Sequence, residues 1–435
     1  MKEEVCMKKS LTIAALLFFV LCFLCFAGGQ KEAAVPTTLK GSTVRCVFPV
    51  HPWTDGVKKL LPEFTAATGI KVNIEEFGTD QMSNKIAVES TAKSSTLDVL
   101  YVRPLNETKL FGKNGWTADL NPYVANDPEF DLKDFIDATI QSLTFEGKLI
   151  GLPATTERQI LYYRKDLLAK KGLKVPKTLN ELMAAAKALH DPANGMYGIV
   201  SRGKQNILIT QFSSYLHSFG GEFNEGDKAL MDTPEAIAAI KFYSTMLREA
   251  GPPGIVNFSW PEAAALMAQG KVAFFTDADA IYLNVVAPDK SVVGDKIGFA
   301  VFPAGPAGSR PYNVCSGAVG IGAYSKQKDA AAAFVRWVTS KDIVMRLQIE
   351  GNSGARKSVW ANPESTKQWP KELVDVINAS NEIGVGWDRP RVINVAQARD
   401  ILSEPILVGF EGGDVEAAAR KAQAEFQALI DSERK

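Results

Sequence analysis

Short apolar runs alternate along the chain with amphipathic segments of helical period. An apolar, β-rich run at 43–50 precedes a helical pattern at 57–67, and apolar and polar residues then alternate at 70–74. Strands have a side-chain period of two and helices one of 3.6, so the order strand, helix, strand is predicted. Such alternation indicates an α/β fold with a mainly parallel sheet. Further strands are predicted at 97–102, 271–276, 297–302 and 318–322.

Helix starts are marked by capping residues. Thr178 with Glu181 three positions later is a capping box, and Thr233 precedes a proline and an apolar stripe. Helical patterns dominate from Lys328, and Asp414 precedes the last of them. This helix-rich tail must pack against an earlier sheet, which predicts lobes built from discontinuous segments.

Length and charge narrow the class of protein. A chain of 435 residues exceeds the usual size of one domain, so two or three are expected. The charges of the 49 basic and 49 acidic residues cancel, so the protein has no net positive charge that would attract nucleic acid or an anionic membrane. A nucleic-acid partner is therefore not expected.

The amino terminus has the layout of a secretory signal. Two lysines, an apolar stretch at 11–26 and the small residues Ala27 to Gly29 follow one another. We expect a signal peptide at 1–29, a flexible lead-in at 30–40, and an exported protein that is soluble in the periplasm or cell envelope after cleavage. Translation from Met7 and a retained membrane anchor remain open.

The cysteines argue against a lipid anchor. Leucine, not a small residue, precedes both Cys22 and Cys25. The mature chain keeps Cys46 and Cys315, each in an apolar run, so two buried thiols are expected and a bridge stays open.

Signatures of cofactor and metal chemistry are missing from the sequence. The three histidines have no metal-site spacing, and no phosphate loop or GxSxG elbow occurs. The SxxK pattern at 201–204 lacks its companion motifs. We expect no cofactor, no metal and no enzyme activity.

Polar and aromatic residues gather where predicted strands end, at 51–54, 103–107, 153–158 and 277–279. In open α/β sheets, ligands bind at the carboxyl ends of strands. Aromatic rings can stack on the C–H faces of a sugar, and carboxylates and guanidinium groups can bond its hydroxyls. These loops are therefore predicted to bind a small neutral sugar or polyol.

The chain resembles the family 1 extracellular solute-binding proteins of ABC importers. The block GKLIGLPATTERQILYYRKDLLAKKGLKVPKTLNEL carries the resemblance, and FGGEFNE, FSWPEAAALMAQGKVAFFTDADA and DAAAAFVRWVTSKD follow in the family's order. FGKNGW, LHDPANGMYGIVSRG, EAGPPG and VGDKIGFAVFPAGPAG look most like the sorbitol/mannitol branch. The resemblance implies a two-lobe periplasmic binding protein fold, type II-like, with three hinge crossovers and the ligand between the lobes. It places lobe 1 at 41–152 and 277–352, and lobe 2 at 156–274 and 357–435.

The resemblance also implies the site. Trp53 is expected to stack on the ligand, and the Arg389 guanidinium is expected to donate two hydrogen bonds to its hydroxyls. Glu157 matches the carboxylate of the polyol-binding loop, whereas the aromatic residue of that loop has no counterpart here. Structural roles remain open for Trp53 and Trp260 as core or rim rings, for Glu157 with Arg158 as a surface pair, and for Asp277 as a helix cap. The candidate ligand-binding residues are Trp53, Arg103, Glu107, Thr156, Glu157, Arg158, Asn206, Trp260, Asp277, Asp279, Asn313, Arg356, Trp387 and Arg389.

The predicted function is that of an ABC transporter's substrate-binding component, a monomer that delivers its ligand to a permease with ATPase subunits. An exported carbohydrate hydrolase using Asp277 and Glu157 remains an alternative. A ligand-sensing domain for a membrane receptor is another.

Overall fold

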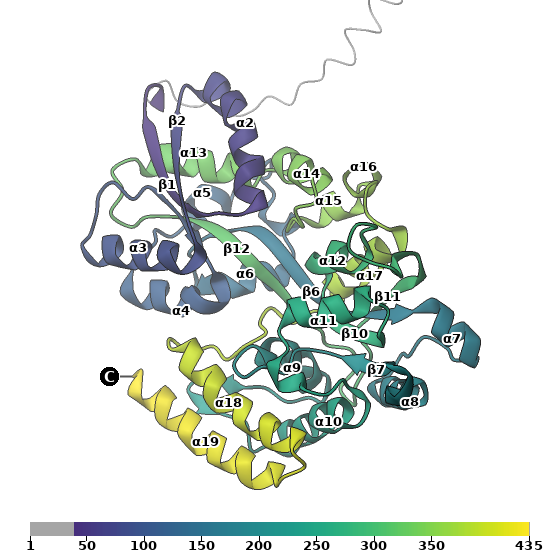
Figure 1. Cartoon of the computed structure of the whole chain (residues 1–435). Coiled ribbons are helices and arrows are strands. Elements are labelled where there is room, and N and C mark those ends of the chain that lie inside the picture. Colours follow the sequence, from purple (N-terminus) through teal and green to yellow (C-terminus); the bar gives the residue numbers. More distant parts are fainter. Residues whose placement is uncertain (1–38, 435) are drawn as a thin grey trace, which may run out of the picture. The chain divides into compact units, whose positions relative to one another are not determined.

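The apolar runs form one large mixed sheet. The structure, a computed structural model, describes residues 39–434, and the chain from Gly41 onward forms one unit. The predicted signal peptide and nearly all of the lead-in lie outside the described residues. The eight-stranded sheet has the order β2-β1-β3-β12-β6-β10-β7, with β11 also paired to β6 (Figure 1). Its strands are β1 (Thr43–Pro49), β2 (Lys71–Phe77), β3 (Val99–Val102), β6 (Leu152–Arg164), β7 (Tyr197–Val200), β10 (Val272–Ala278), β11 (Ile297–Val301) and β12 (Asn313–Ile321).

Helices flank the sheet, and two small hairpins lie outside it. The hairpins pair β4 (Thr144–Phe145) with β5 (Lys148–Leu149), and β8 (Asn224–Glu225) with β9 (Lys228–Ala229). The α-helices are α2 (Pro52–Thr68), α3 (Thr79–Thr91), α4 (Pro104–Asn114), α5 (Asn121–Val124), α6 (Asp137–Ser142), α7 (Lys165–Lys171), α8 (Leu179–Leu189), α9 (Leu208–Ser218), α10 (Pro234–Ala250), α11 (Trp260–Ala268), α12 (Tyr282–Val286), α13 (Lys328–Val338), α14 (Lys341–Ile349), α15 (Lys357–Ala361), α16 (Pro363–Thr366), α17 (Lys371–Ile383), α18 (Val395–Phe410) and α19 (Val415–Ser432). The 3-10 turns are η2 (Leu132–Asp134), η3 (Pro192–Asn194), η4 (Ile255–Asn257), η5 (Asp279–Ile281) and η6 (Gly294–Lys296).

The predicted helix caps are confirmed. The Thr178 side chain accepts from Glu181 N and completes a capping box on α8, and the Thr233 side chain accepts from Ala236 N at the start of α10. Asp414 accepts two backbone N–H groups at the start of α19. Each cap satisfies donors that have no partner inside the helix, so it fixes where the helix begins.

Strand β6 runs through both lobes. Its first half pairs with β12, from Leu152 to Arg158, and its second half pairs with β10 and β11, from Gln159 to Arg164. The segment 153–158, predicted as a loop, is therefore part of a thirteen-residue strand. Helices α2, α3 and α13 pack against the β1–β2–β12 half of the sheet, whereas α8, α10, α11 and α17 pack against the β7–β10–β11 half. The late helices α18 and α19 return to α10, as the sequence indicated.

Strand β11 changes the predicted boundary of the lobes. It was assigned to lobe 1 within 277–352, but it pairs antiparallel with Ile160–Arg164, and Phe299 and Phe302 join the core of the second half. The sequence pattern identified the strand without showing which half of the sheet it joins. We propose instead that the chain re-enters lobe 1 at the start of β12, near Asn313.

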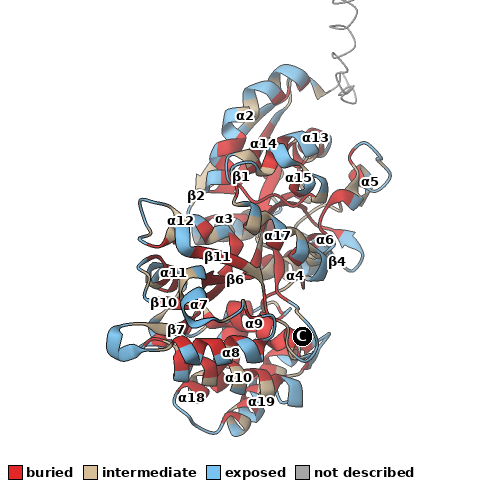
Figure 2. Cartoon of the chain, turned by 90° about the vertical axis from the view of Figure 1, so that its right-hand side faces the viewer, coloured by how far each residue is buried: buried red, intermediate tan, exposed pale blue. Residues whose placement is uncertain are grey.

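Burial follows the layers. Strands in the middle of the sheet are buried along their length, and the helices expose one face to solvent (Figure 2). In α8, Leu182 and Ala186 are fully buried one turn apart, as the amphipathic pattern requires. Cys46 and Cys315 are buried free thiols, which confirms the prediction of two thiols.

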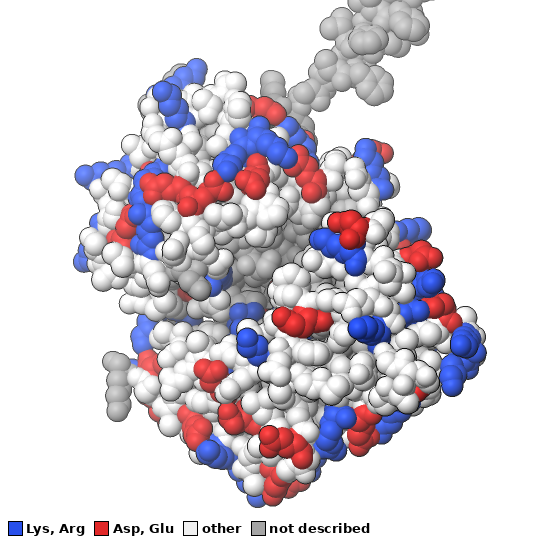
Figure 3. Space-filling view, in the orientation of Figure 1, with Lys and Arg blue, Asp and Glu red and all other residues white. Residues whose placement is uncertain are grey.

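The surface carries charges of both signs. Lysine, arginine, aspartate and glutamate are interspersed over the face shown in Figure 3, which agrees with the balanced composition. Within residues 39–434, no helix combines the length and apolar character needed to cross a bilayer. The same part of the chain contains no group of three or more His, Cys, Asp or Glu arranged to hold a metal ion.

Candidate ligand-binding site

Side-chain alternation along β6 separates the predicted site residues. Arg158 has no exposed surface, and its Nη1 donates to Asp279 Oδ2 at 2.8 Å while its backbone N–H donates to Asp279 Oδ1 at 2.8 Å. The Arg158 Nε donates to Asn381 Oδ1 at 2.7 Å, and the guanidinium lies 5.1 Å from the ring centre of Trp360. Arg158 and Asp279 thus form a buried ion pair whose donors and acceptors are used within the protein.

Two further predicted residues join this buried pair. The Thr156 hydroxyl donates to Gly354 O at 2.9 Å and accepts from Arg158 Nη2 at 2.7 Å. Asn313 Nδ2 donates to Asn381 Oδ1 at 3.2 Å, the atom that also accepts from Arg158. We call Thr156, Arg158, Asp279, Asn313 and Asn381 the hinge brace, because it ties β6 and β12 to α17 and to the segment that begins at Ser353.

Arg356 is another buried structural residue. Its Nε donates to Thr339 O at 2.7 Å, its Nη1 lies 3.2 Å from Asp134 Oδ2, and its guanidinium stacks 4.1 Å from the centre of the Phe135 ring. The structure therefore places Arg356 in the core of the first lobe.

Glu157 faces a different environment from its neighbours. The side chain keeps some contact with solvent although Thr156 and Arg158 on either side are fully buried. Burial raises the pKa of Glu157 to about 7; Arg202 and Arg389 oppose this rise, and Asp388 and Asp279 add to it. Among residues 39–434, no hydrogen-bond donor reaches its carboxylate. Glu157 is thus a half-buried carboxyl group that no hydrogen bond from the described residues satisfies.

Arg202 and Asp277 form the first charged pair beside Glu157. Arg202 Nε and Nη2 donate to Asp277 Oδ2 and Oδ1 at 2.9 and 2.5 Å, and Gln211 Nε2 donates to Asp277 Oδ1 at 3.0 Å. Burial opposes the charge on Arg202, but Asp277 outweighs it and raises the pKa of Arg202. Gln211 Nε2 also donates to the Tyr312 hydroxyl at 3.2 Å, while its buried Oε1 has no partner in the described part of the chain.

Arg389 and Asp388 form the second pair. Arg389 Nε and Nη2 donate to Asp388 Oδ1 and Oδ2 at 2.6 and 2.7 Å. Burial would raise the pKa of Asp388, but Arg389 outweighs it and the pKa is lowered. The remaining Arg389 nitrogen, Nη1, donates to Asn106 Oδ1 on α4 at 3.0 Å. Arg389 therefore links the late loop of the second lobe to the first lobe.

The unpaired Glu157, the two charged pairs, Gln211 and Tyr312 form one group, which we call the chamber. Of the residues predicted from the sequence, the chamber contains Glu157, Asp277 and Arg389. The candidate residues predicted from the sequence do not include Arg202, Gln211, Tyr312 or Asp388. Arg202 stands two residues after β7 ends at Val200, so the rule that sites lie at strand ends could have identified it.

Trp53 is a core residue of the first lobe. It is 1% exposed, and its ring lies 5.6 Å from that of Phe48 and 5.9 Å from that of Tyr101. The Tyr101 hydroxyl lies 3.4 Å from Thr155 Oγ1, on the strand that carries Glu157. Trp53 thus packs against Tyr101, which contacts the strand of Glu157, and its ring has no face exposed to a ligand in this structure.

The pair Arg103 and Glu107 organises the start of α4. Arg103 N and Nε donate to Glu107 at 2.7 and 3.0 Å, and the Ser83 hydroxyl donates to Glu107 Oε1 at 2.6 Å. Glu107 is 4% exposed, so its carboxylate serves mainly to hold this turn.

Three other predicted residues lie outside the chamber. Asn206 Nδ2 donates to Ala396 O at 3.0 Å and so packs its loop against α18. Trp260 begins α11 and is 37% exposed. Trp387 donates its Nε1 to Glu222 Oε2 at 2.8 Å and carries Arg391 over its ring at 4.2 Å.

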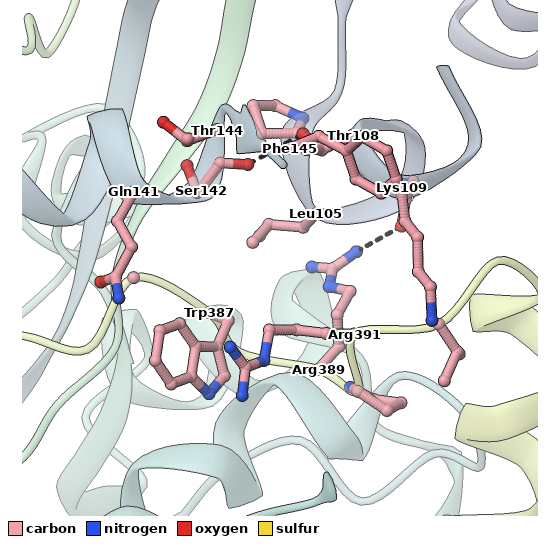
Figure 4. Close-up of a pocket in the computed structure, with 15 residues that line it drawn as sticks. Leu105, Thr108, Lys109, Gln141, Ser142, Thr144, Phe145, Trp387, Arg389 and Arg391 are labelled. Atoms are coloured by element: carbon pink, nitrogen blue, oxygen red, sulfur yellow. Dashed lines mark hydrogen bonds between the residues drawn. The ribbon is translucent and has the colours of Figure 1, made fainter. Parts of the chain in front are cut away.

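A cavity of about 210 Å³ lies on the outer side of Arg389. Its walls come from α4, from the end of α6 with β4, and from the late loop at 386–392 (Figure 4). Leu105 and Phe145 face Trp387 and Arg391 across it. We call this space the rim pocket.

Comparison with known proteins identifies the family of the chain. Residues 52–345 match the family described as bacterial extracellular solute-binding protein. The mannitol-binding protein of Pseudomonas aeruginosa is 31% identical over 267 residues, a match that spans 60% of each chain. An ABC transporter solute-binding protein of Agrobacterium radiobacter K84, solved with ribitol, has a TM-score of 0.74 and 28% identity over 90% of this chain and 99% of that one.

A second solved structure agrees. The solute-binding protein of Agrobacterium vitis S4 with bound D-mannitol has a TM-score of 0.70 and 27% identity, again over 90% of this chain and 99% of that one. Both solved structures therefore share the fold of this chain over almost their whole length. The chain therefore belongs to the family of bacterial extracellular solute-binding proteins, and its function is to bind a solute.

Proposed function

We propose that the chain captures a small neutral polyhydroxylated solute, a sugar alcohol or sugar, in the chamber between its lobes. It would do so as an exported, soluble monomer and deliver the solute to an ABC permease with ATPase subunits. The polyol ligands of relatives that match the chain across both lobes support this class of ligand.

The observation that carries the proposal is the unpaired Glu157 carboxyl between two charged pairs. Arg202 with Asp277, and Arg389 with Asp388, are matched in charge, so they present donors and acceptors without a net charge of their own. Vicinal hydroxyls both donate and accept hydrogen bonds, and such a mixed surface satisfies both roles. Glu157 adds an acceptor when ionised and a donor when protonated.

The arrangement also explains how binding would close the lobes. Glu157 and Arg202 belong to β6 and to the loop after β7, whereas the bond from Arg389 to Asn106 joins the late loop to α4. A solute that touches all of them binds the closed form better than the open form and shifts the population toward it.

We propose no reaction at this site. A hydrolase would need two carboxyl groups free to exchange protons or attack. Asp277 instead accepts hydrogen bonds from Arg202, Gln211 and the backbone of Ala278. Incubation with candidate glycosides should give no turnover.

Glu157→Ala tests the proposal. Loss of one hydrogen bond to a charged group costs about 1.5–3 kcal/mol, so the affinity for the best-binding polyol should fall by roughly ten- to a hundredfold in calorimetry. The exposed Glu425→Ala, which removes a helix carboxylate that lies 3.7 Å from Lys421, is the matched control and should leave affinity unchanged.

Two outcomes would contradict the proposal. Equal affinity of Glu157→Ala and the parent protein would remove Glu157 from the site. A melting-temperature panel of polyols, sugars and sugar acids in which none stabilises the protein would overturn the carrier function, because a ligand of the native state must raise its stability.

A further inference from the structure

The rim pocket differs in charge from the chamber beside it. Its fifteen lining residues include Lys109, Arg389 and Arg391 and contain no aspartate or glutamate. Arg389 belongs to both, because it lines the pocket and also lowers the pKa of Glu157 through its charge. Asp388 already neutralises Arg389, so a solute that extends from the chamber past Arg389 would meet Arg391 and Lys109 as the cations of this pocket.

Arg391 is the cation of this pocket that has no carboxylate partner among residues 39–434. Its guanidinium carbon lies 4.2 Å from the centre of the Trp387 ring, and its only side-chain hydrogen bond within residues 39–434 is a long one, 3.4 Å, from Nη2 to Asn224 O. No carboxylate of the described chain lies within 4.0 Å of it. Contact with the ring keeps the guanidinium at the cavity, where its other N–H groups have no hydrogen-bond acceptor among the described residues (Figure 4).

Two carboxylates that contact residues of this pocket are already occupied. Glu222 accepts from Trp387 Nε1 and from Phe223 N, each at 2.8 Å. Glu433 lies 4.0 Å from Lys109 and accepts from Ile393 N and Asn394 N at 2.8 and 2.6 Å. Both carboxylates therefore hold backbone or ring N–H groups and leave Arg391 unpaired.

The walls also suit a short, partly apolar segment. Leu105 and Phe145 lie across the cavity from Trp387, and about 210 Å³ accommodates a small substituent. Because α4 and β4 belong to one lobe and the loop at 386–392 to the other, an occupant would contact both lobes. It would therefore favour the closed form as the chamber ligand does.

We infer that the rim pocket is an anion subsite that binds a carboxylate or phosphate group carried by a polyhydroxylated solute, with Arg391 and Lys109 as its donors. The inference rests on the proposed function, since the hydroxylated part of the same solute would lie in the chamber. It extends the ligand class from neutral polyols to their acidic derivatives and predicts that the acidic derivatives bind more tightly.

Calorimetry with D-mannitol, D-mannonate and D-mannitol 1-phosphate tests the inference and separates the two anions. At least one acidic compound should bind about tenfold more tightly than D-mannitol, and its advantage should shrink as salt is added. Arg391→Gln should remove most of that advantage while D-mannitol binds within about twofold of the parent value. Lys109→Gln, on the other wall, should act in the same direction, and the exposed Arg420→Gln on α19 should have no effect.

The outcomes are distinct. If D-mannitol binds and neither acid binds better, the anion subsite is refuted and the proposed function stands. If Arg391→Gln weakens all three compounds equally, Arg391 supports the loop and does not select the anion. If none of the three compounds binds but another polyol or sugar of the melting-temperature panel does, the subsite is refuted and the proposed function stands. If no polyol or sugar binds, both fail.

Discussion

Glu157 and Arg158 are neighbours in the sequence, yet they belong to two charged groups with opposite properties. In the hinge brace, Arg158 and Asp279 have no exposed surface. In the chamber, the Arg202 and Arg389 side chains keep 13% and 14% exposure, and the Glu157 carboxyl receives no hydrogen bond from residues 39–434. A charged residue whose hydrogen bonds are all made within the protein thus stabilises the fold. A charged residue with unused hydrogen-bonding capacity, such as Glu157, is suited to bind a ligand.

Removal of Arg158 should be the most damaging change. Arg158→Met would leave Asp279 buried without its cation, which costs about 3–5 kcal/mol, and urea unfolding should show that loss. The double variant Arg158→Met with Asp279→Leu removes both charges and should recover much of it. A single variant that loses less than about 1 kcal/mol would contradict the hinge brace as a structural unit.

The stability contributed by Glu157 should depend on pH. Its pKa is about 7 in the folded protein and near 4.5 as an ordinary glutamate, so the native state binds the proton more tightly than the unfolded state. Stability should then fall as pH rises from about 4.5 to 7 and level off above, by up to about 3 kcal/mol for this group.

Glu157→Gln isolates that dependence, because its amide cannot ionise. The free energy of unfolding of the variant minus that of the parent should be small at pH 5 and should grow in favour of the variant at pH 8. A difference that stays flat across this range would show that Glu157 is not enclosed as described.

Asn106→Ala should have the smallest effect. It removes the bond from Arg389 Nη1, which exists only when the lobes meet, so the closed form should lose about 0.5–1.5 kcal/mol while unfolding in urea stays unchanged. Ligand affinity should weaken a few-fold, since a smaller closed fraction lowers apparent affinity.

Asn114→Ala is the control for that variant. Asn114 ends the same helix and bonds only to Leu110 O within it, at 2.8 Å. Small-angle scattering should show a larger ligand-free radius of gyration for Asn106→Ala than for Asn114→Ala. Equal radii and equal affinities would mean that the bond does not hold the lobes together.

The fold class and the secondary structure could be predicted from the sequence because the patterns that indicate them are local. Apolar periodicity located the strands and the caps Thr178, Thr233 and Asp414 located helix starts, and each depends on residues within a few positions. The partner of β11 could not be predicted, because strand pairing depends on residues more than a hundred positions away.

The site was predicted in part for the same reason. Strand ends and the resemblance both indicate the segments of Glu157 and Asp277, and the resemblance alone indicates Arg389. A loop at 153–158 would allow Thr156 and Arg158 to join Glu157, but in a strand these side chains point the other way. Arg202 was missed because its role comes from Asp277, which lies 75 positions later.

Strand β6 holds Glu157 at the place where the two lobes share one backbone. In the proposed site, the solute would therefore bind at the strand that both halves of the sheet share. If the lobes rotate about this strand, a small rotation there would give a large displacement where α4 meets the late loop, because displacement grows with distance from the axis. A small solute bound next to the axis could then control the relative position of the two lobes.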